Sequence, residues 1–282
     1  MPHVKAKDGI SLHYSVHDYT DPWKKSPVLF LQHGLSRSSE FWYGLIPYLA
    51  RYYKVVCPDL RGVGRSSADF DLEAGITLDN YLSDLVTIAD DVGAETFHYA
   101  GESLGGIIGF FMGAHHADRL RTLSVLSSPL GITPWMKDAF SFGRDNWETG
   151  LRELGVRGWS DAMNSNTRFP ADADPAMLAW YSDQVDKSMS IDVLVAMSYN
   201  ARRADPVAVL DRIAVPTLGI YPTHSRIVTQ DQLDLLRTRI PDSRIVQLPM
   251  PYHMTWVIAP AACANCILHF IATHDGIVCH EG

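Results

Sequence analysis

A serine between glycines is the residue of this chain best suited to chemistry. The pentapeptide Gly101-Glu102-Ser103-Leu104-Gly105 follows a predicted strand, Thr96–Ala100, and opens a predicted helix, Leu104–His115. A sharp strand-to-helix turn exposes the serine hydroxyl, and the glycines let neighbouring backbone approach without a Cβ in the way. The N–H groups at the start of the helix would stabilise negative charge on a reacting carbonyl. We therefore expect Ser103 to be a nucleophile.

Alternating strands and helices are predicted on both sides of this turn. The predicted strands are Ile10–Val16, Pro27–Gln32, Lys54–Pro58, Thr96–Ala100, Arg121–Ser127, Pro216–Tyr221 and Ser243–Leu248. The predicted helices are Phe41–Tyr53, Leu78–Val92, Leu104–His115 and Gln230–Ile240. Such alternation within one domain indicates an α/β fold with a mostly parallel sheet that helices cover on both faces.

The alternation stops between about Gly131 and Asp205, where the pattern is helical and lacks a strand signal. Its tryptophans and methionines suit a binding pocket, although packing of the helices on each other explains most of them equally well. We expect residues 1–130 and 206–282 to form the two parts of the core. Residues 131–205 are expected to form a helical lid (cap) over the carboxyl edge of the sheet.

With these motifs the chain resembles the α/β-hydrolase superfamily, particularly small lidded members such as esterases, enol-lactonases and carbon–carbon bond hydrolases. The resemblance covers nearly the whole chain and includes Leu31-Gln32-His33-Gly34-Leu35, residues 58–66, Val215-Pro216-Thr217-Leu218 and a late histidine, His253. It implies the α/β-hydrolase fold with a nucleophile elbow, and chemistry that needs no metal or organic cofactor.

The resemblance also implies roles for three further residues. The residues after His33-Gly34 and after the nucleophile, Leu35 and Leu104, would supply the two N–H groups of an oxyanion hole. His253 would act as general base toward Ser103 and then as general acid toward the leaving group. Family members usually have a glycine before this histidine, where this chain has Tyr252.

The third member of a catalytic triad, an acid, is missing from both positions where the family places it. The usual position falls on Ser225 and the alternative on Ser127 and Ser128. Three interpretations remain: a Ser–His dyad oriented by a serine or a water, a carboxylate such as Asp231 that reaches His253 from an unusual position, or drift away from hydrolysis. We favour the dyad. Glu102 adjoins the nucleophile, but we expect its role to be structural.

Aromatic and basic residues suggest where a substrate would bind. Arg37 in the oxyanion loop, with Trp135 and Trp159 in the lid, are the candidate substrate-binding residues. Six arginines between residues 131 and 205 would also suit a carboxylate clamp, although pairing with surface Asp and Glu explains most of them. These lid arginines are Arg144, Arg152, Arg157, Arg168, Arg202 and Arg203. We expect a small-molecule substrate, with a hint of a carboxylate or a lactone.

Composition narrows the classes of partner. A formal net charge of -8 argues against binding to nucleic acid or to an anionic membrane surface. The N-terminal residues show no apolar targeting stretch, and apolar runs are too short to span a bilayer, so we expect a cytoplasmic protein. Four cysteines do not form a disulfide framework, and Cys263 and Cys266 are interpreted as small apolar residues on one face of the last helix. The oligomeric state stays open.

The favoured function is a serine hydrolase that cleaves an ester, lactone, amide or activated carbon–carbon bond through an acyl-enzyme on Ser103. A cofactor-free oxygenase or a lyase on the same fold is the first alternative, because fold does not fix function. A ligand receptor without catalysis is the second, and loss of the acid favours it slightly.

Overall fold

The structure is a computed structural model and describes residues 2–164 and 167–276. Within these residues eight strands form one sheet in the order β1-β2-β4-β3-β5-β6-β7-β8. The strands are β1 His3–Lys5, β2 Ser11–His17, β3 Val28–Gln32, β4 Lys54–Pro58, β5 Phe97–Glu102, β6 Leu120–Leu126, β7 Thr217–Pro222 and β8 Ser243–Leu248. β2 pairs antiparallel with β1 and β4, and the other neighbours are parallel. The predicted mostly parallel sheet is confirmed, with every predicted strand within two residues of its observed bounds.

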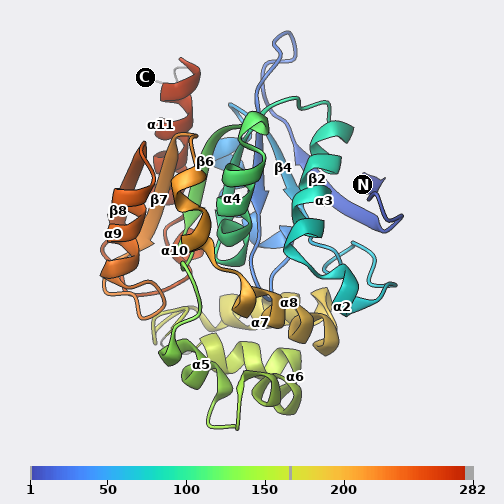
Figure 1. The fold of residues 1–282 in the computed structure, drawn as a ribbon, viewed down its shortest axis with the longest axis vertical. Helices are drawn as coiled ribbons and strands as arrows, with labels where there is room; N and C mark the ends of the chain where they lie inside the picture. Colours follow the sequence, from blue (N-terminus) through green and yellow to red (C-terminus); the bar gives the residue numbers. More distant parts are fainter. Residues whose placement is uncertain (1, 165–166, 277–282) are drawn as a thin grey trace.

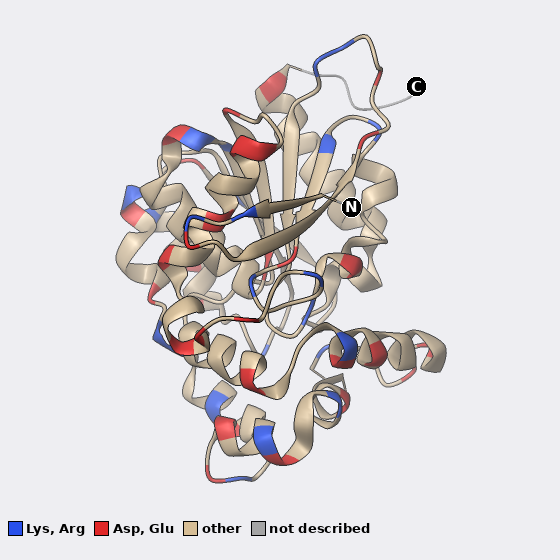
Figure 2. Ribbon diagram, turned by 90° about the vertical axis from the view of Figure 1, so that its right-hand side faces the viewer, with Lys and Arg blue, Asp and Glu red and all other residues tan. Residues whose placement is uncertain are grey.

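Helices lie on both sides of the sheet (Figures 1 and 2). One layer contains α3 (Leu78–Asp91), α4 (Leu104–His115), the 3₁₀ helix η3 (Pro206–Arg212) and α9 (Gln230–Arg239), which contact one another. In a second layer α1 (Ile46–Leu49) packs on α11 (Pro260–Asp275). β3 and β5 are buried at every residue, as strands covered on both faces must be. The remaining short elements are η1 Ser39–Trp42, α2 Leu72–Gly75, η2 Ala117–Arg119 and α10 Thr255–Ile258.

The continuous helix predicted for residues 41–53 is wrong. The chain instead forms η1 and, after Gly44, the single turn α1. Pro47 lies in the first turn of α1, where its missing N–H costs nothing. Its ring would clash with the backbone of a preceding helical turn, so a helix cannot continue through it. The apolar residues whose spacing suggested one helix still pack into the core, since Trp42 and Leu49 are fully buried.

Between β6 and η3 the chain forms four inserted helices, which lie together at one end of the sheet (Figure 1). They are α5 Pro134–Ser141, α6 Trp147–Asn164, α7 Pro175–Ser188 and α8 Ile191–Arg203. α6 contacts the other three, and its tryptophans Trp147 and Trp159 stack with ring centroids 6.4 Å apart. Much of the aromatic content therefore packs these helices together. Among the helices that the structure describes, none is both long enough and apolar enough to cross a membrane.

Candidate active site

Ser103 lies in a strained backbone conformation at the junction of β5 and α4. Its φ of 51° and ψ of -116° are rare for a residue with a side chain, and Ser103 directly precedes the first residue of α4. Close packing requires the flanking glycines, because a Cβ on Gly105 would lie 2.2 Å from the Gln32 carbonyl oxygen and one on Gly101 would lie 2.4 Å from the Gly105 carbonyl oxygen. The sharp turn predicted from the pentapeptide is present.

A small cavity of about 40 Å³ lies at this turn, between the sheet and the inserted helices. The core contributes Leu35, Arg37, Ser103, Ile227 and His253, and the insertion contributes Met136, Phe140, Trp159, Met163 and Arg168. The structure thus brings together most of the residues predicted for the site. Trp135 does not line the cavity but packs edge-on against Phe140.

The amides of Leu35 and Leu104 are without an acceptor in the described part of the chain. Leu104 is the first residue of α4, so its N–H has no acceptor within the helix. The loop that carries Leu35 turns sharply at Ser36, where φ is 61°.

Glu102 and Arg37 form a buried ion pair beneath this loop. The guanidinium donates to both carboxylate oxygens, at 2.5 and 2.6 Å, and both side chains are at most 2% exposed. Glu102 also accepts a hydrogen bond from the Gly34 N–H, which ties the loop of residues 33–37 to the residue before Ser103. Glu102 thus holds Gly34 and Arg37 in place, which is the kind of structural role predicted for it. A Cβ on Gly34 would lie within 3 Å of both partners, so only glycine fits there.

The loop after β4 supports the loop of residues 33–39 from the other side. The Leu60 N–H donates to His33 Nε2 at 3.0 Å, and the Ser39 N–H donates to Asp59 Oδ1 at 2.8 Å. His33 and Asp59 are both buried. His33 is thus a structural residue of the loop.

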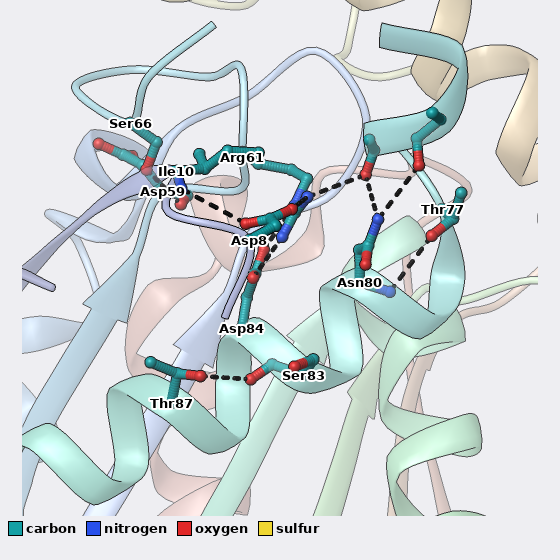
Figure 3. Close-up of polar contacts among 12 residues, drawn as sticks. Asp8, Ile10, Asp59, Arg61, Ser66, Thr77, Asn80, Ser83, Asp84 and Thr87 are labelled. Atoms are coloured by element: carbon teal, nitrogen blue, oxygen red, sulfur yellow. Dashed lines mark hydrogen bonds and ion pairs between the residues drawn. The ribbon is translucent and has the colours of Figure 1, made fainter. Parts of the chain in front are cut away.

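Arg61 holds the same loop to the core (Figure 3). Its guanidinium donates to both carboxylate oxygens of Asp84 on α3, at 2.7 and 2.6 Å, and to Asp8 at 2.8 Å. In the same view the Ser66 hydroxyl donates to the Asp59 carbonyl at 2.8 Å and closes the loop. These contacts lie away from the cavity and position it indirectly.

His253 is buried, with 5% of its surface exposed. The backbone N–H of His253 donates to the Thr167 carbonyl at 3.0 Å, so the insertion helps to hold this residue. Its Nδ1 has no hydrogen-bond partner in the described part of the chain. Burial, reinforced by the positive charges of Arg37 and Arg168, holds the pKa of His253 well below 6.5. The imidazole is therefore neutral at physiological pH, the state in which it can accept a proton.

The positions expected for an acid carry serines with other contacts. The Ser225 hydroxyl accepts from the Ile227 and Val228 N–H groups at 3.1 and 3.0 Å. Ser127 Oγ lies 3.3 Å from Thr255 Oγ1. Asp231 is exposed in the first turn of α9, and the described residues place no acceptor, Asp231 included, at His253 Nδ1.

The insertion's arginines separate into surface residues and one cavity residue. Arg144, Arg152 and Arg157 form ion pairs with Glu or Asp at the surface. Arg202 and Arg203 contact aromatic rings, including that of Tyr199. Arg168 alone of the six lines the cavity.

Part of the cavity wall has no distinguishing signal in the sequence. Met136 and Phe140 line the cavity with Met163, but apolar residues at helical spacing are as typical of ordinary packing as of a pocket. Cys57, Cys263 and Cys266 are free thiols, in line with the sequence analysis, and Cys279 lies outside the described residues.

Comparison with known proteins identifies the family to which this fold belongs. The family model described as alpha/beta hydrolase fold matches residues 27–258. Among curated relatives, the pimeloyl-[acyl-carrier protein] methyl ester esterase of Aeromonas hydrophila is 27% identical over 261 residues, which cover 88% of this chain and 96% of the relative. The strigolactone esterase of Arabidopsis thaliana is 26% identical over 250 residues, covering 84% and 90%.

Among solved structures, the enol-lactonase from Burkholderia xenovorans superimposes with a TM-score of 0.84 at 22% identity, covering 96% of this chain and 100% of the other. That likeness extends over the sheet, the flanking helices and the insertion together. Because the family model also spans most of the sequence, the chain belongs to the alpha/beta hydrolase fold family of enzymes.

Proposed function

We propose that this protein is a serine hydrolase of small-molecule esters or lactones, with Ser103 as nucleophile and His253 as base. The observation that carries the proposal is the shared cavity: it contains the strained Ser103, the neutral buried His253 and the loop that bears the Leu35 amide. The names of the two esterases and the enol-lactonase support the substrate class.

The proposed mechanism uses two steps through an acyl-enzyme. Ser103 Oγ attacks the scissile carbonyl carbon while His253 takes the hydroxyl proton, and the oxyanion accepts hydrogen bonds from the Leu35 and Leu104 N–H groups. The tetrahedral intermediate collapses as His253 gives the proton to the leaving alkoxide. Water then attacks the acyl-enzyme with His253 again as base, which releases the acid and regenerates Ser103.

The inserted helices would act as the lid over this site. The cavity of about 40 Å³ is much smaller than the roughly 300–1,000 Å³ of typical small-molecule sites. A substrate therefore requires the helices that contribute Met136, Phe140 and Met163 to move away from Ser103. The closed arrangement would exclude water during the first step.

The test combines covalent labelling with turnover. Wild-type protein should react with a fluorophosphonate probe and hydrolyse ethyl butyrate, whereas Ser103→Ala should lose both. His253→Ala should lower both rates by at least about 10³-fold. Matched controls are Ser198→Ala, which removes a buried hydroxyl on α8, and His269→Ala, which removes an exposed imidazole on α11. Equal labelling of wild type and Ser103→Ala, or none of either, would refute the proposal.

A further inference from the structure

Arg168 is a buried cation beside the proposed nucleophile, and it has no carboxylate partner in the described part of the chain. It is 2% exposed and lines the cavity with Ser103 and His253. Its guanidinium donates to neutral oxygens only: Ser36 Oγ at 3.0 Å, and Ser160 Oγ and Asn164 Oδ1 at 3.3 Å. Burial lowers the pKa of Arg168 to about 10, so the group still carries its charge at neutral pH.

The remaining charges near the cavity do not balance Arg168. Arg37, the other arginine in the cavity wall, is neutralised by its bidentate pair with Glu102. His253 is neutral, because burial and the two arginines hold its pKa well below 6.5. The cavity therefore carries one net positive charge. Burying a charge without a counter-ion is strongly unfavourable, so a missing anionic partner is the simplest reason for its presence.

Among the buried arginines in the described residues, Arg168 alone lacks a carboxylate, since Arg37 pairs with Glu102 and Arg61 with Asp84. Positions of both signs are interspersed along the inserted helices (Figure 2), and Arg152 and Arg157 each contact two carboxylates there. Arg144, which is also at the surface of the insertion, pairs with Glu153. At Arg168 it supplies hydroxyl and amide oxygens, which orient a guanidinium without neutralising it.

The guanidinium is also held rigidly against the site. Its Cζ lies 5.3 Å from the ring centre of Trp159 and 5.5 Å from that of Tyr181. The backbone N–H of Met254 donates to the Arg168 carbonyl at 3.3 Å. This hydrogen bond lies next to the one from the His253 N–H to the Thr167 carbonyl. The backbone segments that carry Arg168 and His253 are therefore joined. A cation fixed in this way loses little further freedom when an anion binds.

We propose that Arg168 is the receptor for a carboxylate group of the substrate, so that the protein prefers esters or lactones bearing an anion close to the scissile carbonyl. The guanidinium fork matches a carboxylate and can donate two parallel hydrogen bonds to it. Arg168 contacts Ser36, the neighbour of Leu35. An anion bound to Arg168 would therefore lie close to the proposed oxyanion hole, so only a short spacer would separate the carboxylate from the scissile carbonyl of the substrate. This inference rests on the proposed hydrolase function.

The kinetic test compares two esters that differ only in charge, monoethyl glutarate and ethyl glutaramate, by ethanol release. Wild type should favour the carboxylate in kcat/KM by about 30-fold, the worth of a good charged hydrogen bond. Arg168→Gln should abolish this preference, chiefly by raising KM for the carboxylate ester. Arg168→Lys should keep part of the preference, because it keeps the charge but loses the fork.

Arg157→Gln is the matched control, since it removes an exposed cation from α6 and changes the net charge equally. It should leave the preference intact. Circular dichroism and melting of all variants check folding, and Arg168→Gln should melt no lower than wild type because it removes an uncompensated buried charge. Equal kcat/KM for the two esters in the wild type, or an unchanged preference in Arg168→Gln, would overturn the inference while leaving the hydrolase function intact.

A binding measurement separates the two proposals. If no ester is turned over and the fluorophosphonate does not label Ser103, the hydrolase function fails. Calorimetric titration with glutarate then decides the anion site by itself. Binding of glutarate by wild type but not by Arg168→Gln would support the carboxylate receptor, and equal or absent binding to both proteins would refute it.

Discussion

At the scale of single residues, His253 has an environment unlike that of the histidine in a catalytic triad. A triad aspartate accepts the Nδ1 proton, fixes the tautomer and stabilises the imidazolium. Here Nδ1 has no partner in the described part of the chain, and two guanidinium groups stand nearby. These surroundings favour the neutral imidazole and would stabilise poorly the imidazolium that the proposed mechanism requires.

The pH profile should report this environment. Protonation inactivates the base, so a lowered pKa lets activity persist to lower pH. With neutral ethyl butyrate, kcat/KM should fall on the acid side with an inflection below pH 6.5, because burial, Arg37 and Arg168 depress the pKa of His253 in the free enzyme. Arg168→Gln removes one of these cations and should move the inflection upward. An inflection at or above 6.5 in the wild type would contradict the charge assignment.

Restoring an acid should improve the dyad. The resemblance to α/β-hydrolases implies an acid at the position of Ser225, whose oxygen accepts hydrogen bonds from the Ile227 and Val228 N–H groups. An aspartate oxygen can accept the same bonds while it offers a second oxygen to Nδ1. Ser225→Asp should raise kcat by about tenfold or more and raise the pKa of His253, whereas the isosteric Ser225→Asn should not. A rate no higher than that of Ser225→Asn would mean that this position does not reach the imidazole.

At the scale of secondary structure, the loops that carry the site depend on buried ion pairs in the core. Arg61 is 1% exposed and satisfies both oxygens of Asp84. Arg61→Met should cost about 3–5 kcal/mol of the free energy of unfolding, because it leaves the Asp84 carboxylate buried without a partner. Denaturant titration measures the loss. The exposed pair of Arg237 with Asp234 is the control, and Arg237→Met should cost less than about 1 kcal/mol.

The double variant Arg61→Met/Asp84→Leu tests the stated cause. It removes both charges, so it should recover much of the stability lost in Arg61→Met. If the two substitutions instead add without recovery, the loss comes from packing of the Arg61 side chain rather than from an unpaired carboxylate.

Elements with a local signal were predicted well from the sequence. The bounds of α4 match the prediction because glycine-flanked Ser103 fixes its start and an unbroken apolar run follows. The helix predicted across Pro47 was wrong because apolar spacing outweighed the steric effect of one proline.

The site could be predicted only in part. Ser103 and His253 were found through motif and resemblance, and both line the cavity. The pairing of Arg37 with Glu102 links residues 65 positions apart, which no local pattern reveals. Arg168 was one of six similar arginines, and only the tertiary structure distinguishes it from those with surface partners.

At the scale of the whole molecule, the net charge and the cavity charge have opposite signs. The chain carries a formal net charge of -8, whereas the cavity holds one uncompensated positive group. An anionic substrate is therefore repelled at long range and attracted once it enters. Salt weakens the long-range repulsion more than the attraction inside the cavity, because exposed charges are screened beyond the Debye length and buried charges much less.

This difference predicts the sign of the salt effect. Raising ionic strength from about 0.01 to 0.15 M shortens the Debye length from about 30 to 8 Å, which removes most of the long-range repulsion. The kcat/KM for monoethyl glutarate should then rise by about twofold, while that for ethyl glutaramate stays flat. Stopped-time ethanol assays at constant pH measure both. A kcat/KM for the carboxylate that falls with salt would mean that surface cations near the entrance, rather than buried Arg168, draw the anion in.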